Sequence, residues 1–402
     1  MMALPVDDII CLRNGQAPGH LELIHDMTLG TDVWLSRFET HYLDRFIPGG
    51  GSKVKVLIGS EGSGKSHLLR YIQYLSLQKN YTALYLSART VGSKLCDVPS
   101  LYRLIAASMD LDHVLTGLAC KVGAELGYGK AIYDGTGRLL PYVAEEGYSA
   151  PDAAREIRIT ISRLLRNADL SPSFFTFAVS LLKERLIGLD IDEHHLAERW
   201  IRGEKLQPFE RRDSGLYEVL NKTTARRWLD SLLKLLVLSG QQGLVILIDD
   251  LDVLYERSPE NGRYLYTPAN NKDTYELFRQ LIDDADLLKN LMIVLAGRRN
   301  LLEDEKRGFK SYEALWMRLQ TGLVPSGLFN ALCDIVDVDQ HLAALGQEFP
   351  ARLSEHLKRV FAQYGLKRKP KDQPPLELVM PALKSVVMGN TFTSDGATED
   401  SI

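Results

Sequence analysis

Four short stretches of mainly apolar residues stand out along the chain, at residues 54–58, 81–86, 244–248 and 291–296. Each has the length of a strand, and runs of this kind are typical of strands that are buried on both faces of a sheet. A shorter apolar stretch at residues 335–338 predicts one further strand. The chain therefore contains the strands of a single buried sheet, spread over most of its length.

A helical pattern fills the space between the first two of these strands. Residues 66–76 carry Leu68, Leu69, Ile72 and Leu75 at the spacing of one helix face. A strand, a helix and a second strand in succession predict parallel strands joined by a right-handed crossover. The fold class is therefore expected to be α/β, with a parallel sheet flanked by helices.

The remaining pattern divides the chain into three expected parts. Residues 1–48 mix polar and apolar positions at helical spacing and predict a helical lead-in. Residues 49–338 hold the strands, with a helical insertion at about 99–240. Residues 339–402 predict a small helical lid that ends in a polar tail. A length of 402 residues suits such a division, because it exceeds what one compact core usually holds.

Some details inside these parts are also expected. Residues 123–147 are rich in glycine and predict a loop or a small hairpin, and a helix is expected to start at Asp190 or Asp192. Residues 258–272 are polar and contain proline and glycine, which predicts a loop. Residues 273–286 have the periodicity of an amphipathic helix.

A glycine-rich turn directly follows the first predicted strand and fits the pattern G-x-x-x-x-G-K-[ST] at every fixed position. Glycines let the backbone fold around a phosphate with its N–H groups inward, and the following helix points its positive end at the same anion. Lys65 is expected to reach the β- and γ-phosphates, and the Ser66 hydroxyl to bind Mg²⁺. The expected nucleotide contacts are Gly59, Ser60, Glu61, Gly62, Ser63, Gly64, Lys65, Ser66 and His67.

An acidic pair follows the apolar run at residues 244–248. The carboxyl ends of parallel strands form the ligand-binding edge of a sheet, so Asp249 is expected to hold Mg²⁺. Asp250 stands where many ATPases place a glutamate that orients the attacking water, and its shorter side chain predicts slow hydrolysis. Asp252 is an alternative for that role. We expect the acidic pair and Lys65 to meet across neighbouring strands in one cavity.

Two further positions are candidates for contacts with the γ-phosphate. One of Arg298, Arg299 and Asn300, which follow the run at residues 291–296, is expected to sense it; the pattern does not choose among the three. Residues 311–318 predict one helix, and Arg318 on it is a candidate arginine finger for the ATP of a neighbouring subunit. The alternative is an arginine on a solvated helix surface.

Composition restricts the class of protein. The formal net charge is −4, so no overall basic field implies a nucleic-acid partner, although a local basic face remains compatible with it. The four cysteines are scattered without metal-ligand spacing and predict free thiols in a reducing cytoplasm. No stretch approaches the roughly twenty apolar residues that span a bilayer, and the first residues do not resemble a signal peptide. We therefore expect a cytoplasmic protein without a membrane partner.

Several stretches outside these motifs resemble the BrxD-like ATP-binding proteins of the BREX system of bacterial phage defence. Residues 8–15 and 18–21 resemble the opening of that family, in which Arg-x-Gly precedes a proline. Residues 197–204, with Trp-Ile-Arg-Gly-Glu, and residues 311–315, with Ser-Tyr-x-Ala-Leu, are the most specific matches. The resemblance covers about residues 5–320. The chain departs from the family at Leu29, Gly30, Thr31 and Asp32, where a Gly-Arg pair usually lies near the nucleotide.

The resemblance implies more than the motifs do. Such proteins are similar to AAA+ ATPases of the origin-recognition type, which implies ATP and Mg²⁺ as cofactors. It also implies a homo-oligomer that hydrolyses ATP in anti-phage defence and works with a helicase, with another protein of the system or on DNA.

Three other functions use the same phosphate cradle. The first is a nucleotide-gated switch or scaffold with little hydrolysis, which the short Asp250 side chain favours. The second is a small-molecule kinase. The third is a DNA-translocating motor or a DNA-binding helicase loader outside defence, and the sequence shows no helicase motifs beyond the two ATP motifs.

Overall fold

The computed structural model describes residues 4–32, 34–188, 194–319, 331, 333–370 and 390–394. Its centre is a five-stranded parallel sheet with the strand order β2-β3-β4-β1-β5. The strands are β1 (Ser52–Gly59), β2 (Thr82–Ser87), β3 (Leu244–Asp249), β4 (Leu291–Arg298) and β5 (Ile335–Asp337). The ends of each lie within two residues of a predicted strand. The chain is therefore a mixed α/β protein, as predicted.

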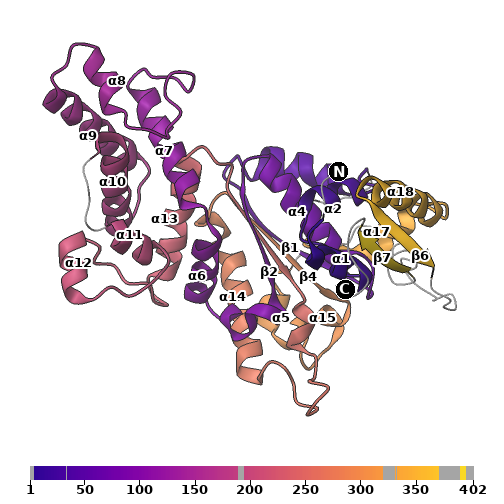
Figure 1. The fold of residues 1–402 in the computed structure, drawn as a ribbon. Coiled ribbons are helices and arrows are strands. Elements are labelled where there is room, and N and C mark those ends of the chain that lie inside the picture. The colour runs from indigo at the N-terminus through magenta and orange to yellow at the C-terminus, as the bar shows by residue number, and fades with distance from the viewer. Residues whose placement is uncertain are drawn as a thin grey trace.

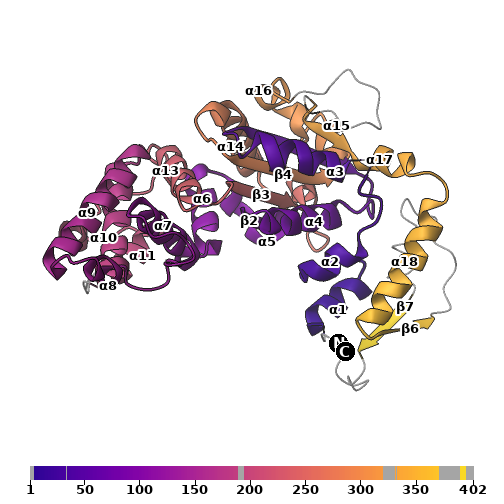
Figure 2. The same ribbon diagram turned by 90° about the horizontal axis from the view of Figure 1, so that it is seen from above.

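The two faces of this sheet pack against different helices, because alternate side chains of each strand point to opposite sides. On one face, residues such as Leu57, Val245 and Val294 pack with α3 and α4. On the other, residues such as Ile58, Ile246 and Ile293 pack with α14 and the helices that follow β2. Figures 1 and 2 show the sheet between these layers. The helices beside the sheet are α3 (Leu35–Phe38), α4 (Lys65–Gln78), α5 (Ala88–Val91), α14 (Pro268–Asp283), α15 (Asn300–Glu303) and α16 (Glu313–Trp316).

Eight helices of the described chain that follow α5 and precede β3 form a lobe on one side of the sheet (Figure 1). Buried aromatic rings hold its inner part together, with Trp200 and Trp228 only 4.4 Å apart between ring centroids and Phe174 against both. The helices are α6 (Val98–Ser108), α7 (Leu111–Glu125), α8 (Leu140–Glu145), α9 (Ala150–Asn167), α10 (Pro172–Ile187), α11 (His194–Ile201), α12 (Pro208–Ser214) and α13 (Ala225–Leu238).

The two ends of the described chain pack together on the opposite side of the sheet (Figure 2). Leu12, Leu23 and Met27 share a core with Leu353 and Leu357. The first part of the lead-in, with α1 and α2, and the C-terminal segment thus share one small core beside the sheet, whereas the rest of the lead-in packs on the sheet itself. Its elements are α1 (Val6–Arg13), α2 (Leu21–Met27), α17 (Val338–Ala344), α18 (Phe349–Gln363) and the antiparallel strands β6 (Leu366–Pro370) and β7 (Asn390–Ser394).

Several local predictions need correction. Strands β1 and β3 are not neighbours, because β4 lies between them. In the glycine-rich stretch at residues 123–147, residues 126–139 form the predicted loop and no hairpin, but the end of α7 and the short helix α8 flank this loop. Helix α14 starts at Pro268 instead of residue 273, with Thr267 capping it through a hydrogen bond from Asn270 N at 3.2 Å.

Other predictions concern the C-terminal third of the chain and residues outside the described ranges. Residues 311–318 do not form one helix: a 3₁₀ turn, Phe309–Ser311, precedes the single turn of α16. The C-terminal segment contains the β6–β7 pair as well as helices. The predicted helix start at Asp190 or Asp192 lies outside the described residues, as does the tail beyond residue 394. All four cysteines are free, as expected. Within the described ranges, no helix combines the length and apolarity needed to cross a membrane.

Candidate functional site

The glycine-rich turn has the backbone that a phosphate cradle requires. It connects the end of β1 at Gly59 with the start of α4 at Lys65. Gly62 and Gly64 have φ values of 77° and 91°, a left-handed conformation that side chains with a Cβ rarely adopt. Ser63 between them is buried. Helix α4 runs for 14 residues from this turn, so its positive N-terminal end faces any anion held there.

Lys65 lies folded onto the turn. Its Nζ donates to the carbonyl oxygens of Gly59 at 3.1 Å and Ser60 at 2.7 Å, and lies 3.3 Å from Ser63 Oγ. Burial lowers the pKa of Lys65, and the nearby carboxylates, with Asp252 first, act in the opposite direction. A phosphate in the cradle would offer this ammonium charged oxygens in place of neutral carbonyls, which strengthens its hydrogen bonds.

The acidic pair is held by the neighbouring strand β2. The Tyr85 hydroxyl donates to Asp249 Oδ2 at 2.6 Å, and the Ser87 hydroxyl donates to Asp250 Oδ2 at 2.5 Å. The other oxygen of Asp249 accepts from the backbone N–H of Asp250 at 2.8 Å. Burial and, after it, the charge of Asp249 raise the pKa of Asp250, while the bond from Ser87 opposes that rise.

The cradle and the acidic pair line one cavity of about 360 Å³. The turn and the first residues of α4 contribute Gly62, Gly64, Lys65, Ser66 and His67 to its lining, with Arg70 farther along α4. Tyr85, Ser87, Asp249 and Asp250 line it from the carboxyl ends of β2 and β3, and residues of α1 and the segment after it complete the lining. Its size is in the range of small-molecule sites. The expectation of a shared cavity is thus confirmed, although the two strands that supply it are separated by β4.

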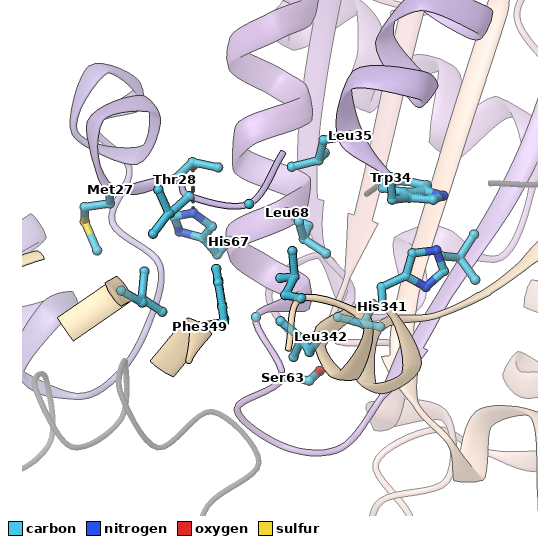
Figure 3. A pocket seen from close by; sticks show the side chains of 17 residues that line it. Met27, Thr28, Trp34, Leu35, Ser63, His67, Leu68, His341, Leu342 and Phe349 are labelled. Atoms are coloured by element: carbon cyan, nitrogen blue, oxygen red, sulfur yellow. Dashed lines mark hydrogen bonds between the residues drawn. The ribbon is translucent and has the colours of Figure 1, made fainter. Parts of the chain in front are cut away.

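A smaller apolar cavity of about 80 Å³ adjoins the first and shares Met27, Gly64 and His67 with it. Figure 3 shows side chains from the N-terminal segment and from the C-terminal helices converging on it. Thr28 Oγ1 lies 2.9 Å from His67 Nε2, and burial lowers the pKa of His67 to about 4, so the imidazole is neutral near pH 7. The full lining is Met27, Thr28, Leu29, Gly30, Trp34, Leu35, Ser63, Gly64, His67, Leu68, Val336, Val338, His341, Leu342, Leu345, Phe349 and Leu353.

Gly30 lies against the C-terminal side chains that line this apolar cavity and leaves no room for a side chain of its own. A Cβ at Gly30 would lie 2.9 Å from the side chains of Leu345 and Phe349, and the φ of 78° also favours glycine. In the sequence, Leu29 and Gly30 stand out only as a departure from a family pattern. The apolar cavity was not predicted, because the residues that line it come from segments about 300 residues apart.

The first three residues of the turn are not among the residues that line either cavity. Gly59 ends β1, and Ser60 donates through its backbone N–H and its hydroxyl to the carboxylate of Asp339, at 2.8 and 2.9 Å. Arg298 Nη2 lies 3.3 Å from Glu61 Oε2. These residues connect the turn to α17 and to the end of β4 rather than lining the nucleotide cavity.

The candidates after β4 have separate surroundings. The Arg298 side chain lies beside Glu61 and Asp252, whereas Arg299 Nη2 pairs with Asp337 at 2.7 Å. Asn300 starts α15. Among these three, Arg298 is the cation in contact with the phosphate turn.

Asp252 is fully engaged elsewhere. Its Oδ1 accepts from the Arg298 backbone N–H at 2.6 Å and from the Tyr255 hydroxyl at 2.5 Å, and its Oδ2 lies 3.4 Å from Arg298 Nε. It is not among the residues that line either cavity. This placement favours Asp250 over Asp252 as the residue beside an attacking water.

Arg318 lies away from the cavity of its own chain. Its Nε pairs with Asp283 Oδ1 at 2.5 Å, and its Nη1 donates to the carbonyl oxygen of Ala314 at 2.6 Å. About a third of its side chain is exposed. A role in its own subunit's site is therefore not supported, and a role toward a neighbouring copy stays a prediction.

Magnesium would be bound partly by protein oxygens and partly by oxygens of the nucleotide and of water. Among the described residues, no group of three or more His, Cys, Asp or Glu side chains could hold a metal by itself. Ser66 and Asp249 supply a hydroxyl and a carboxylate in one cavity, which are the hard oxygen ligands that Mg²⁺ binds together with phosphate and water. The donor set fits a metal that arrives with a nucleotide.

Comparison with known proteins places the chain in a family. The family model of the BREX system ATP-binding proteins BrxC/D matches residues 9–383. Neither the curated proteins nor the solved structures contain a match. The matched range includes both cavities and nearly all of the described residues.

Proposed function

The chain belongs to the BrxC/BrxD family of BREX system ATP-binding proteins, and on that basis we propose that it binds ATP with Mg²⁺ and hydrolyses it slowly. The observation that carries the proposal is the single cavity that Lys65, Ser66, Asp249 and Asp250 line together. A lysine, a hydroxyl and two carboxylates around a glycine-rich turn match the charges of a metal–triphosphate.

The two cavities suit the two halves of the nucleotide. The polar cavity beside Lys65 takes the phosphates, and the apolar cavity beyond Gly64 and His67 takes the base. The base would displace Leu345 and Phe349 from Gly30, since the cavity is smaller than a purine in the present arrangement. Binding would therefore move α17 and α18 relative to the cradle.

The metal has a defined place in this proposal. Ser66 and Asp249 hold it, and it neutralises charge on the phosphates when bound. Tyr85 keeps the Asp249 carboxylate turned toward the cavity through its hydrogen bond. The chain's own part is thus to orient two oxygen ligands, and β2 fixes one of them.

Hydrolysis depends on Asp250 in this account. Its carboxylate orients water while Ser87 holds one of its oxygens. The short side chain and the hydrogen bond to Ser87 both limit its reach, which predicts slow turnover. The same observations favour the second candidate function, a nucleotide-gated switch with little hydrolysis.

Two arginines have proposed roles toward the γ-phosphate. Arg298 senses it in the same subunit, because its guanidinium touches Glu61 at the edge of the turn. Arg318 acts on the ATP of a neighbouring copy, so that ATP joins the subunits of a homo-oligomer. An AAA+-like arrangement, partners within the BREX system, a helicase or DNA as a partner, and a cytoplasmic location belong to the same proposal, as does the division of the chain at about residues 48 and 338.

Phosphate release and equilibrium ATP binding, measured on the full chain and on Lys65→Ala, test the proposal together. Binding by the wild-type chain with slow turnover, both lost in the variant, supports an ATPase. Binding without turnover supports the switch. Absence of binding in the wild-type chain overturns both functions.

A further inference from the structure

A shallow groove of about 490 Å³ lies along the exposed side of α9, and all of its lining residues belong to that helix. Figures 1 and 2 show α9 in the helical lobe, away from the sheet. Four arginines dominate its lining, and no acidic side chain takes part in it. The groove is lined by Arg155, Arg158, Ile159, Ser162, Arg163, Arg166 and Asn167.

The helix itself explains why these arginines share one face. Residues at spacings of three, four and seven lie on the same side of an α-helix, and Arg155, Arg158 and Arg166 are exposed. The opposite face carries Ile157, Ile161 and other residues that are fully buried against the lobe. Helix α9 is 18 residues long and is therefore a rigid support for the arginines.

Most of this charge is not neutralised by the protein. In the part of the chain that the structure describes, Arg155, Arg158 and Arg166 form no ion pair, and Arg163 lies 3.6 Å from Glu125 with both side chains about half exposed. Exposed pairs of that kind contribute little. The whole chain has a formal net charge of −4, so a groove with four cations is a local concentration against the overall sign.

The chemistry of the lining indicates which ligand fits. Guanidinium groups bind phosphates through two parallel hydrogen bonds, and Ser162 and Asn167 add neutral donors of the kind that contact nucleic-acid backbones. Arg155 and Arg166 are eleven residues apart, or about 16 Å along the helix, a length over which duplex DNA presents several phosphates. No aromatic side chain lines the groove, so it lacks the stacking surface that single-strand binders use.

We propose that this groove binds the phosphate backbone of duplex nucleic acid without reading its sequence. The site is separate from the nucleotide cavities; it gives the proposed DNA partner a place on the chain, and it rests on that part of the proposed function and not on ATP hydrolysis. Each arginine neutralises backbone charge, and the occupant lies along α9 on the outside of the helical lobe.

Binding of a fluorescent mixed-sequence DNA duplex to the full chain, followed by anisotropy at several salt concentrations, tests the proposal. The variant Arg155→Ala/Arg158→Ala/Arg166→Ala removes three cations. It is expected to weaken binding by about 100-fold at 100 mM salt and to reduce the slope of log K against log salt by about 2.7. The matched control, Arg202→Ala/Arg212→Ala/Arg359→Ala, removes three exposed arginines elsewhere and should bind like the wild-type chain. Lys65→Ala without ATP should also bind like it, which separates this site from the ATP site.

Additional variants and ligands keep the test decisive. Replacing the three groove arginines by lysine keeps the charge and should retain most of the binding, whereas a folding defect would appear in thermal melts of either groove variant. Wild-type affinity in the alanine variant, equal loss in the control variant, or no duplex binding at all would overturn the proposal. Tighter binding of a single strand, or of polyglutamate at equal charge, would overturn the assignment to duplex nucleic acid.

Discussion

The hydroxyl of Tyr85 donates a hydrogen bond of 2.6 Å to Asp249, the carboxylate that lines the same cavity as the glycine-rich turn. The guanidinium of Arg70 stacks on the same ring, 3.5 Å from its centroid. Two contacts thus hold the Tyr85 side chain in place: Arg70 stacks on its ring, and Asp249 accepts the hydrogen bond from its hydroxyl. It connects helix α4, which starts at the cradle, to the carboxyl end of β3.

Removing this hydroxyl should weaken metal binding. In Tyr85→Phe the Asp249 carboxylate loses a donor that orients it, and losses of this kind usually cost about 10- to 100-fold in metal affinity or activity. A titration of Mg²⁺ against ATP turnover measures the effect. Tyr217→Phe, at a well-exposed tyrosine, is the control and should leave the titration unchanged. An unchanged Mg²⁺ requirement in Tyr85→Phe would contradict the proposed role of Asp249.

Asp250→Asn should separate binding from turnover. Asp250 has a φ of 58°, a left-handed conformation that asparagine tolerates about as well as aspartate, so the substitution removes charge without adding backbone strain. Turnover should fall by about 10²-fold or more while ATP affinity stays within a few-fold of the wild-type value. Phosphate release and equilibrium binding measure the two effects. Equal turnover would return the role to Asp252 despite its contacts with Arg298 and Tyr255.

His67 should make the fold sensitive to acid. Burial lowers its pKa to about 4 in the folded chain, whereas an unfolded histidine titrates near 6.5. The unfolded state therefore binds the proton first, and the free energy of unfolding falls as the pH drops from about 6.5 toward 4. The loss attributable to this residue is at most about 3 kcal/mol.

Chemical denaturation between pH 4.5 and 7.5 measures this dependence. The variant His67→Gln keeps a polar side chain near Thr28 and should show a shallower decline than the wild-type chain. His113→Gln, at an exposed histidine outside both cavities, serves as the control. Parallel curves for the wild-type chain and His67→Gln would show that His67 is not held neutral.

Arg318 can be tested by mixing two inactive proteins. If Arg318 acts on the ATP of a neighbouring copy, Arg318→Ala and Lys65→Ala are each expected to lose turnover, by about 10³-fold or more for the arginine. Mixed oligomers contain some sites with an intact cradle next to an intact Arg318, so turnover should partly return. Arg359→Ala, at an exposed arginine of α18, should remain active alone. If turnover does not return on mixing, Arg318 does not act on the ATP of a neighbouring copy, and its role is limited to the surface ion pair with Asp283.

The local pattern of the sequence was enough to predict the strands, the glycine-rich turn with Lys65 and the acidic pair that starts at Asp249. Apolar runs locate β2, β3 and β4 to within a few residues, and Lys65 and Asp249 lie in one cavity as expected. The placement of β4 between β1 and β3 was missed, because the order of strands depends on long-range pairing that no local run encodes.

The contacts that support the site were also beyond a local reading. Tyr85 meets Asp249 only through the register of β2 on β3, and Ser60 meets Asp339 across 279 residues of chain. The apolar cavity around Gly30 depends on Leu345 and Phe349 from the opposite end. The spacing of Tyr85 and Ser87, two residues apart on the strand before the long insertion, was the one available signal, since such residues share a strand face.

The most direct test of the central claim is a double-mutant cycle on MgATP affinity. Calorimetric titration of the wild-type chain, Lys65→Ala, Asp249→Asn and the double variant measures whether the two side chains act on one ligand. If Lys65 and Asp249 bind the same metal–triphosphate, the double variant should lose less binding free energy than the two single variants lose in sum. The expected coupling energy is about 0.5–3 kcal/mol. Strictly additive losses, or unchanged affinity in either single variant, would contradict a shared site.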